Sequence, residues 1–105
     1  MMRIAILASA VLAIGLAAAS DVTQIDAQLL ASAYAARYLP ACIAQQPKLQ
    51  GDHWEAAVVS GRPPTPSGTI RIDQATGSVS YDGPLGSKPT ASAAALRHYI
   101  EYGHD

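Results

Sequence analysis

The sequence predicts an α+β domain: an N-terminal helix packed on a small antiparallel sheet of about three strands, followed by a C-terminal helix. Three observations support this prediction. Residues 69–81 alternate apolar and polar side chains on both sides of a short polar turn, as a hairpin does. Residues 20–39 and 92–103 repeat apolar side chains at helical spacing. The order helix, strand, strand pair, helix favours both helices on one face of the sheet.

Residues 1–19 have the pattern of an export signal. Arg3 precedes an almost unbroken apolar run from Ile4 to Leu16, and small residues follow at Ala17–Ala19. The apolar run is shorter than the roughly 20 residues of a membrane span. We predict a signal peptide over 1–19, a single domain over 20–105, and a periplasmic or secreted protein without stable membrane insertion. The alternative is an uncleaved anchor helix.

The remaining chain is small and nearly neutral. It has 105 − 19 = 86 residues and no Phe, so its core is small, and a homodimer or another partner would add buried surface. Without Arg3, six Lys and Arg stand against eight Asp and Glu, which gives 6 − 8 = −2 with His neutral. The basic residues are scattered along the chain, so nucleic acid is not an expected partner.

The first helix is predicted to begin at Asp21 or Ser20, with Gln24 completing a capping box, and to end near Leu39 before Pro40. The apolar residues expected to face the sheet recur every three or four positions: Val22, Ile25, Leu29, Leu30, Ala33, Tyr34, Ala36 and Tyr38. Residues 41–46 are interpreted as another short helical turn, and residues 49–52 as a turn containing Gly51.

Residues 53–60 are predicted to form a strand. Trp54 is expected to pack over the helix with its indole N–H at the rim, and the alternative is a ligand-binding aromatic side chain. The proline-rich segment 61–68 is predicted to be a loop because proline cannot donate to a strand ladder. It is either a stiff connection or an exposed, pre-ordered recognition loop. The candidate binding residues are Trp54, Arg62, Pro63, Pro64, Thr65 and Pro66.

The hairpin of residues 69–81 has the clearest pattern. Asp73 is expected to accept backbone N–H groups of the turn, Thr76 belongs to the same turn, and Gly77 supplies a positive φ. Residues 82–89 form a second irregular segment. The last helix is predicted to be capped by Thr90 or Ser92 and to end at Gly103. Its expected apolar side consists of Ala93, Leu96, Tyr99 and Ile100.

The sequence contains no recognisable catalytic motif, such as Gly-x-Ser-x-Gly or a phosphate-binding loop. Cys42 is the only cysteine, so an intramolecular disulfide is excluded. It is interpreted as a small buried residue, and the alternatives are an intermolecular disulfide or a reactive thiol beside His53, His98 or His104. His98, Glu101, His104 and Asp105 are interpreted as a solvated tail rather than a metal site. No catalytic residue, metal or cofactor is predicted.

The segment from Trp54 to Tyr81 resembles a bacterial envelope theme, in which a strand opening with Trp leads to an Asp-x-x-Thr-Gly-x-Val hairpin. The residues that carry this resemblance are Trp54, Gly68, Ile72, Asp73, Thr76, Gly77 and Val79. The hairpin is similar to that of PepSY-type domains, and the Trp strand with the hairpin is also similar to small immunity proteins of nuclear-transport-factor-2-like (cystatin-like) fold. Segment 61–68 and the C-terminal helix depart from both families. The resemblance implies binding, often to another protein in the periplasm, and transfers no catalytic residue.

These observations favour a non-catalytic protein-binding module, such as an inhibitor or an immunity-like protein, that uses segments 61–68 and 82–89. Two alternatives remain open. One is a small thiol-dependent enzyme using Cys42 with a histidine. The other is a structural subunit whose small core is completed by self-association.

Overall fold

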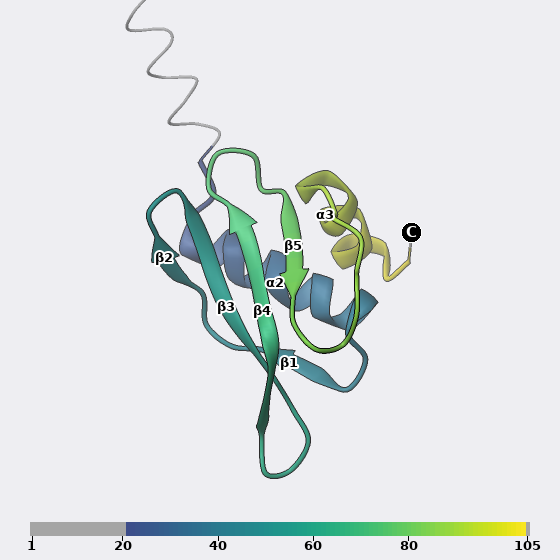
Figure 1. Ribbon diagram of the computed structural model, residues 1–105. Coiled ribbons are helices and arrows are strands. Elements are labelled where there is room, and N and C mark those ends of the chain that lie inside the picture. The colour runs from purple at the N-terminus through teal and green to yellow at the C-terminus, as the bar shows by residue number, and fades with distance from the viewer. Residues whose placement is uncertain (1–20, 105) are drawn as a thin grey trace, which may run out of the picture.

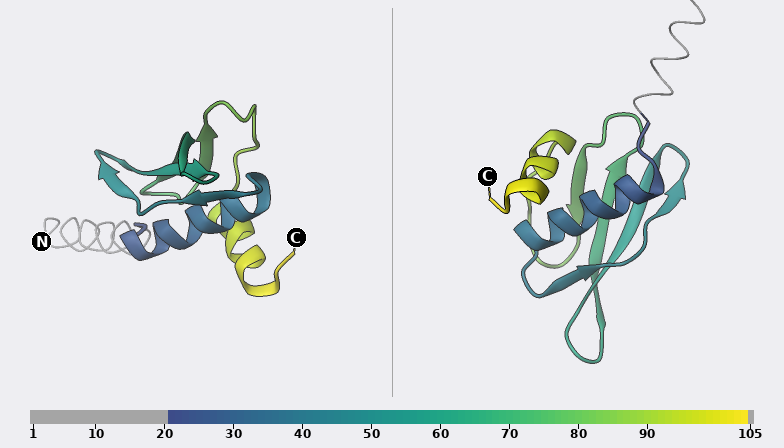
Figure 2. Two further views of the ribbon diagram at one scale, coloured as in Figure 1. Left: turned by 90° about the horizontal axis from the view of Figure 1, so that it is seen from below. Right: turned by 180° about the vertical axis from the view of Figure 1, so that it is seen from behind.

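The computed structural model describes residues 21–104, so the predicted signal peptide at residues 1–19 and Asp105 lie outside the described residues. Residues 21–104 have the predicted α+β architecture, in which the two described helices lie on one face of an antiparallel sheet and leave its other face uncovered (Figures 1 and 2). The elements follow in the order α2 (Gln24–Tyr38), β1 (Cys42–Ala44), β2 (Lys48–Gln50), β3 (His53–Ser60), β4 (Thr65–Asp73), β5 (Val79–Asp82) and α3 (Ala93–Tyr102).

The sheet is built around β3. Strand β4 pairs along one side of β3, and β5 pairs with the far side of β4. On its other side β3 carries two short strands in succession: β2 beside its N-terminal half and β1 beside its C-terminal half. The prediction of a helical turn over 41–46 was therefore wrong. The predicted turn at Gly51 is present but shorter than 49–52: it covers residues 51–52, and Leu49 and Gln50 belong to β2. Three-residue edge strands are too short for a readable period, and pairing with β3 decides their conformation.

The hairpin of β4 and β5 confirms the predicted alternation. Ile70 pairs with Tyr81 and Ile72 pairs with Val79, with all four side chains toward the helices. Gly77 has a φ of 77°, which L-residues adopt only at a cost. The turn that precedes it is held by the Asp73 carboxylate, as predicted.

Strand β4 begins earlier than the sequence predicted. Thr65 pairs with Ser60 and Pro66 with Val59, so the loop spans residues 61–64 rather than 61–68. Pairing with β5 covers only Thr69–Ile72. Pro66 therefore lies where β4 has a neighbour on one side, which is where a strand tolerates proline.

The core lies between α2 and the sheet. The face of α2 that meets the sheet consists of Ala27, Leu30, Ala31, Tyr34 and Ala35. Ile25 and Leu29, which the sequence assigned to this face, are 75% and 51% exposed, and Ala36 is exposed too. This part of the prediction was wrong because α2 is apolar on two sides, and periodicity alone does not say which side a sheet will cover.

The N-cap of α2 is Thr23 rather than Asp21 or Ser20: its Oγ1 accepts a hydrogen bond from the N–H of Asp26 at 3.3 Å. Trp54 confirms its predicted place, because it packs against the core and its indole N–H donates to the carbonyl of Val22 at 3.0 Å. No helix among residues 21–104 is long and apolar enough to cross a membrane.

The ends of α3 are as predicted. Ser92 caps the helix by accepting from the N–H of Ala95 at 3.1 Å, and Gly103 ends it with a φ of 74°. Ala93 and Leu96 are buried. Ile100, in contrast, is 46% exposed and does not belong to the buried side.

Gly77 provides a test of this packing. A Cβ at this position would lie 2.7 Å from the Cβ of Ala93, so Gly77→Ala adds a clash between the turn and α3 to the cost of a positive φ. We expect a loss of about 2–4 kcal/mol in the free energy of unfolding, measured by urea denaturation. Gly51→Ala is the matched control, because Gly51 also has a positive φ but open space around it, and should cost only about 1 kcal/mol. Equal losses would contradict the contact.

Candidate binding surface

The face of the sheet that the helices leave uncovered is polar. Because strand side chains alternate, Trp54 and Ala56 point to the helices while His53, Glu55 and Ala57 point away from them. The corresponding residues of β4 and β5 are Thr69, Arg71, Ser80 and Asp82. We call this the open face. It is the side of the molecule that a partner can reach without disturbing the core.

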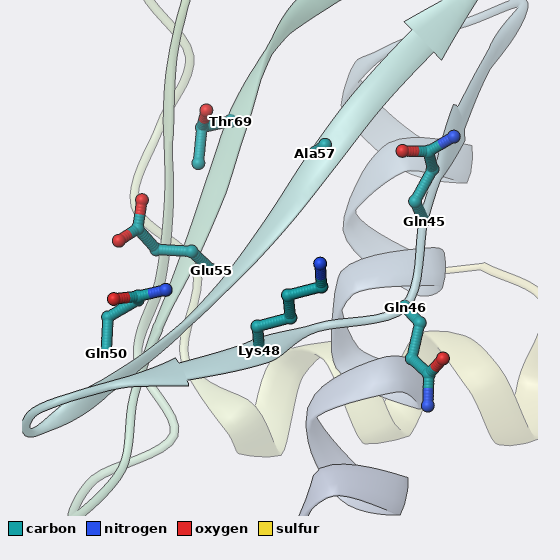
Figure 3. A pocket seen from close by; sticks show the side chains of 7 residues that line it. All are labelled: Gln45, Gln46, Lys48, Gln50, Glu55, Ala57 and Thr69. Carbon is teal, nitrogen blue, oxygen red and sulfur yellow. The ribbon is translucent and has the colours of Figure 1, made fainter.

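Two neighbouring depressions mark the open face. One has a volume of about 220 Å³ and is seen in Figure 3 with α2 behind the sheet; it is lined by Gln45, Gln46, Lys48, Gln50, Glu55, Ala57 and Thr69. The other has a volume of about 340 Å³ and is lined by His53, Glu55, Thr69, Arg71, Ser80 and Asp82. Glu55 and Thr69 line both. The two depressions therefore form one continuous polar surface across β2, β3, β4 and β5.

Charges of both signs alternate across this surface. Lys48 pairs with Glu55, Glu55 with Arg71, and Arg71 with Ser80 in the strand registers. Glu55 thus lies between two cationic residues on neighbouring strands, an arrangement of opposite charges that stabilises cross-strand pairs. The same alternation offers both hydrogen-bond donors and acceptors to a partner.

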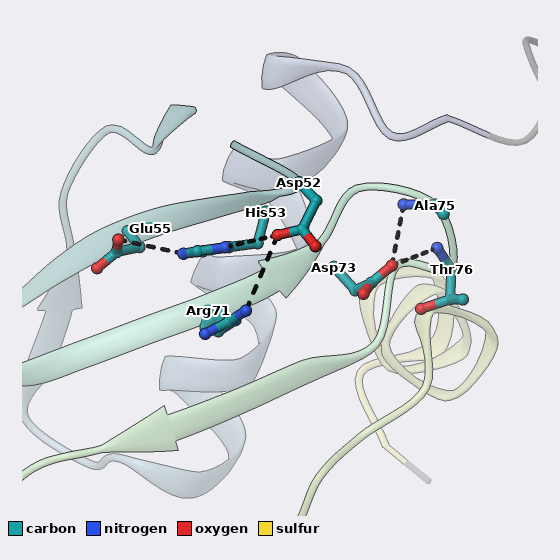
Figure 4. A network of polar contacts seen from close by, with 7 residues as sticks. All are labelled: Asp52, His53, Glu55, Arg71, Asp73, Ala75 and Thr76. Atoms are coloured by element: carbon teal, nitrogen blue, oxygen red, sulfur yellow. Dashed lines mark hydrogen bonds and ion pairs between the residues drawn. The ribbon is translucent and has the colours of Figure 1, made fainter. Parts of the chain in front are cut away.

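His53 joins two carboxylates on this face (Figure 4). Its Nδ1 lies 3.1 Å from Asp52 Oδ1, and its Nε2 lies 3.2 Å from Glu55 Oε2. Arg71 Nη2 lies 3.9 Å from the same Asp52 oxygen. A neutral imidazole has one N–H and donates to one carboxylate, whereas the protonated ring donates to both. The hydrogen bond from His53 is the main cause that lowers the pKa of Asp52.

The Asp73 turn closes one end of the open face (Figure 4). The Asp73 carboxylate accepts from the N–H of Ala75 at 3.0 Å and of Thr76 at 2.9 Å. The Thr76 hydroxyl accepts from the N–H of Ser78 at 3.2 Å. Asp73, Thr76 and Gly77 therefore have the structural role that the sequence predicted. The hydrogen bond from Thr76 is the main cause that lowers the pKa of Asp73.

The structure brings the two predicted contact segments to the same end of the sheet. The connection between β3 and β4 projects there together with the first residues of β4, and we call residues 61–66 the arm. The chain also leaves β5 at that end (Figure 1). The Tyr81 hydroxyl donates to the carbonyl of Ser67 at 2.6 Å and accepts from the N–H of Leu85 at 3.3 Å. All five candidate residues of the arm are exposed: Arg62, Pro63, Pro64, Thr65 and Pro66. Trp54 lies on the helix-covered face and does not join this surface.

Sequence reasoning missed the open face itself as a site. The period-two pattern placed His53 and Glu55 on the face opposite Trp54 and Ala56, and an uncovered antiparallel sheet exposes such a face. That signal was sufficient to find the residues of β3, β4 and β5. Lys48 and Gln50 could not be assigned to the open face from the sequence, because β2 was not predicted as a strand.

Cys42 does not form a thiol–imidazole pair with His53. Cys42 pairs with Ser60 at one end of β3, and His53 begins β3 at the other end. From His53 to Ser60 the strand makes seven residue steps, which separate these ends by roughly 20 Å. Cys42 is half-buried against the core rather than fully buried.

The C-terminal histidines make ring contacts. His98 and Tyr102 have centroids 4.6 Å apart, and His98 and His104 have centroids 6.2 Å apart. Within residues 21–104, no group of three or more His, Cys, Asp or Glu side chains is placed to hold a metal ion. Asp105, the fourth residue of the metal-site alternative, lies outside the described residues.

Comparison with known proteins found no matching family model, no matching curated protein and no matching solved structure.

The Asp73 carboxylate predicts acid sensitivity. Its pKa is lower in the folded chain than in the unfolded chain, so its stabilising contribution is complete above the unfolded value and is lost as the pH falls through the folded value. Below about pH 4 the wild type should therefore lose stability faster than Asp73→Asn, which keeps an oxygen acceptor but cannot titrate. Urea midpoints measured over a pH series test this. Asp82→Asn, the same change at an exposed position, is the control; identical profiles for wild type and Asp73→Asn would contradict the expectation.

The Tyr81 hydroxyl should hold the arm base to segment 83–89. Tyr81→Phe removes the hydrogen bonds to Ser67 and Leu85, which should cost about 1 kcal/mol in unfolding free energy. Limited proteolysis of segment 83–89 should also become faster. Tyr102→Phe, at a side chain that is 56% exposed, is the matched control. Unchanged proteolysis in Tyr81→Phe would show that the hydroxyl does not order this segment.

Proposed function

We propose that this chain is an exported, non-catalytic module that binds another protein through the open face of its sheet and the adjoining arm. The single observation that carries the proposal is a polar sheet face that neither α2 nor α3 covers, hollowed by two adjoining depressions. The apolar run of residues 4–16, with Arg3 before it and small residues after it, supports export to the periplasm or beyond.

The chemistry of the open face favours a polar protein surface as the partner. Non-obligate interfaces combine hydrogen bonds with complementary charges, and the amide, hydroxyl and charged side chains here supply both. A polyanion fits less well, because Glu55 separates Lys48 from Arg71 and Asp82 lies at the edge of the same surface.

The arm supports an inhibitor-like or immunity-like role. Its base is tied by the 2.6 Å hydrogen bond between the hydroxyls of Ser60 and Ser67, and Ser67 is buried. Prolines stiffen the tip and Arg62 is exposed on it. A loop ordered before binding loses less conformational entropy in the complex. The PepSY-like and cystatin-like resemblance of Trp54–Tyr81 agrees with a protein-binding role.

Charge reversal on the open face tests the proposal. A chain beginning at Ser20 is immobilised, proteins captured from a bacterial envelope extract are identified by mass spectrometry, and the captured partner is purified and titrated. Arg71→Glu should raise the dissociation constant about tenfold or more, because it reverses the charge that this position presents to the partner. Arg97→Glu is the matched control, since Arg97 is exposed on α3, and should bind as the wild type does. Equal affinities for both variants would contradict the open face as the contact.

The arm is tested separately with Arg62→Ala and Thr65→Ala together. The pair should weaken binding of the same purified partner without changing the urea midpoint, because both side chains are exposed. Wild-type affinity would remove the arm from the contact and leave the open face alone.

A further inference from the structure

The outer side of α2 carries an apolar ridge that the fold does not use. Ile25 is 75% exposed and Leu29 is 51% exposed, and Ser32 and Ala36 follow on the same side, also exposed. The steps of four, three and four residues place these four side chains in one line along the helix. This line lies opposite the buried face of α2, so we call it the outer ridge.

The outer ridge differs from the other exposed apolar side chains. Ile43, Leu49 and Leu85 are exposed singly, on β1, on β2 and in the segment after β5, and single exposed side chains are ordinary. Ile25 and Leu29 instead lie one turn apart on one helix. Next to α2 the helix α3 projects away from the sheet (Figure 2) and exposes Ile100 and Tyr102. The helix side of the molecule therefore exposes four large apolar side chains, at positions 25, 29, 100 and 102, among polar ones such as Gln28 and Arg97.

We propose that the outer ridge is the contact with a second copy of this chain, with the two α2 helices antiparallel about a two-fold axis. In a two-fold contact, if residue i meets residue j, then j meets i. An axis between Leu29 and Ser32 pairs Leu29 with the partner's Ser32 and Ile25 with the partner's Ala36. Each large side chain thus meets a small one. A parallel arrangement in register would instead set each large side chain against its own copy.

The charges of α2 agree with the antiparallel arrangement. Asp26 lies in the first turn and Arg37 in the last turn of the helix. Antiparallel pairing brings the acidic first turn of each helix to the same end as the partner's basic last turn, and it also opposes the two helix dipoles. A parallel pair would bring like charges together at both ends.

The small core of the chain is a physical reason for this contact. The buried residues of the core include many alanines: Ala27, Ala31, Ala33, Ala35, Ala56, Ala91 and Ala93. A small domain with such a core gains from covering further apolar side chains. In a two-fold dimer each copy buries its own Ile25 and Leu29, so the apolar surface removed from water is doubled.

Sedimentation equilibrium of a chain beginning at Ser20 tests the proposal. The described helices, sheet and core all lie within residues 21–104, so this chain contains every described element. The wild type should sediment as a dimer at micromolar concentration. Ile25→Lys should raise the dimer dissociation constant roughly a hundredfold, because it places two buried charges in one contact. The matched control is Ile43→Lys, the same change at a side chain that is 68% exposed on β1, and it should leave the dimer intact.

Two further experiments test the geometry. Ala36→Leu should weaken the dimer because it opposes the partner's Ile25, and Ile25→Ala combined with Ala36→Leu should restore it by exchanging the large and small positions. In a Cys42→Ser background, a chain with Ile25→Cys and Ala36→Cys should form, on oxidation, a disulfide that joins positions 25 and 36 of different copies. Peptide mapping would distinguish this link from one joining two copies of position 25.

A monomeric wild type, a dimer unaffected by Ile25→Lys, or a link between two copies of position 25 would each overturn the proposal. Arg71→Glu on the open face should leave sedimentation unchanged. Loss of partner binding and loss of the dimer are therefore separate outcomes, and one can fail without the other.

Discussion

The packing of the alanine-rich face of α2 on the sheet is the constraint on which the rest of this structure depends. Ala27, Ala31 and Ala35 let the helix axis approach the strands closely, while Leu30 and Tyr34 are buried in the same cluster as Ile70 and Ile72. A close helix covers one sheet face, and no helix within residues 21–104 covers the other. Because α2 packs on the sheet through its alanine-rich face, the opposite side of the helix, with the outer ridge, and the opposite side of the sheet, with the open face, both remain exposed.

The Asp73 turn connects this helix–sheet core to the remaining elements. The carbonyl of Gln74 accepts the N–H of Val22, and the carbonyl of Val22 accepts the indole N–H of Trp54. Gly77 lies against Ala93 at the start of α3. A turn of a few residues therefore holds the entry to α2, the rim of β3 and the start of α3. Local turn chemistry, rather than a large core, supplies much of the specificity in a chain with few bulky side chains.

The sheet edges are short or interrupted, which favours recognition through its open face. One edge is divided between β1 and β2 at Pro47, whose carbonyl accepts a hydrogen bond from the Gln24 side chain at 3.0 Å. At the other edge Val79 exchanges backbone hydrogen bonds with Ala91. Continuing that antiparallel register sets Tyr81 opposite Pro89, which has no N–H. Short, interrupted and proline-containing edges resist the addition of another strand.

The sequence by itself determined the features that local physics controls. Period-two alternation around a Gly77 turn specifies the β4–β5 hairpin, Ser92 and Gly103 specify the ends of α3, and the single Cys42 excludes an internal disulfide. Tertiary structure alone decided what depends on distant partners. The three-residue strands β1 and β2 exist because β3 pairs with them, and β4 extends to Thr65 because β3 continues beside it. Tertiary packing also determined which side of α2 is buried. Both sides of that helix are apolar, and only contact with the sheet distinguishes the buried Leu30 from the exposed Leu29.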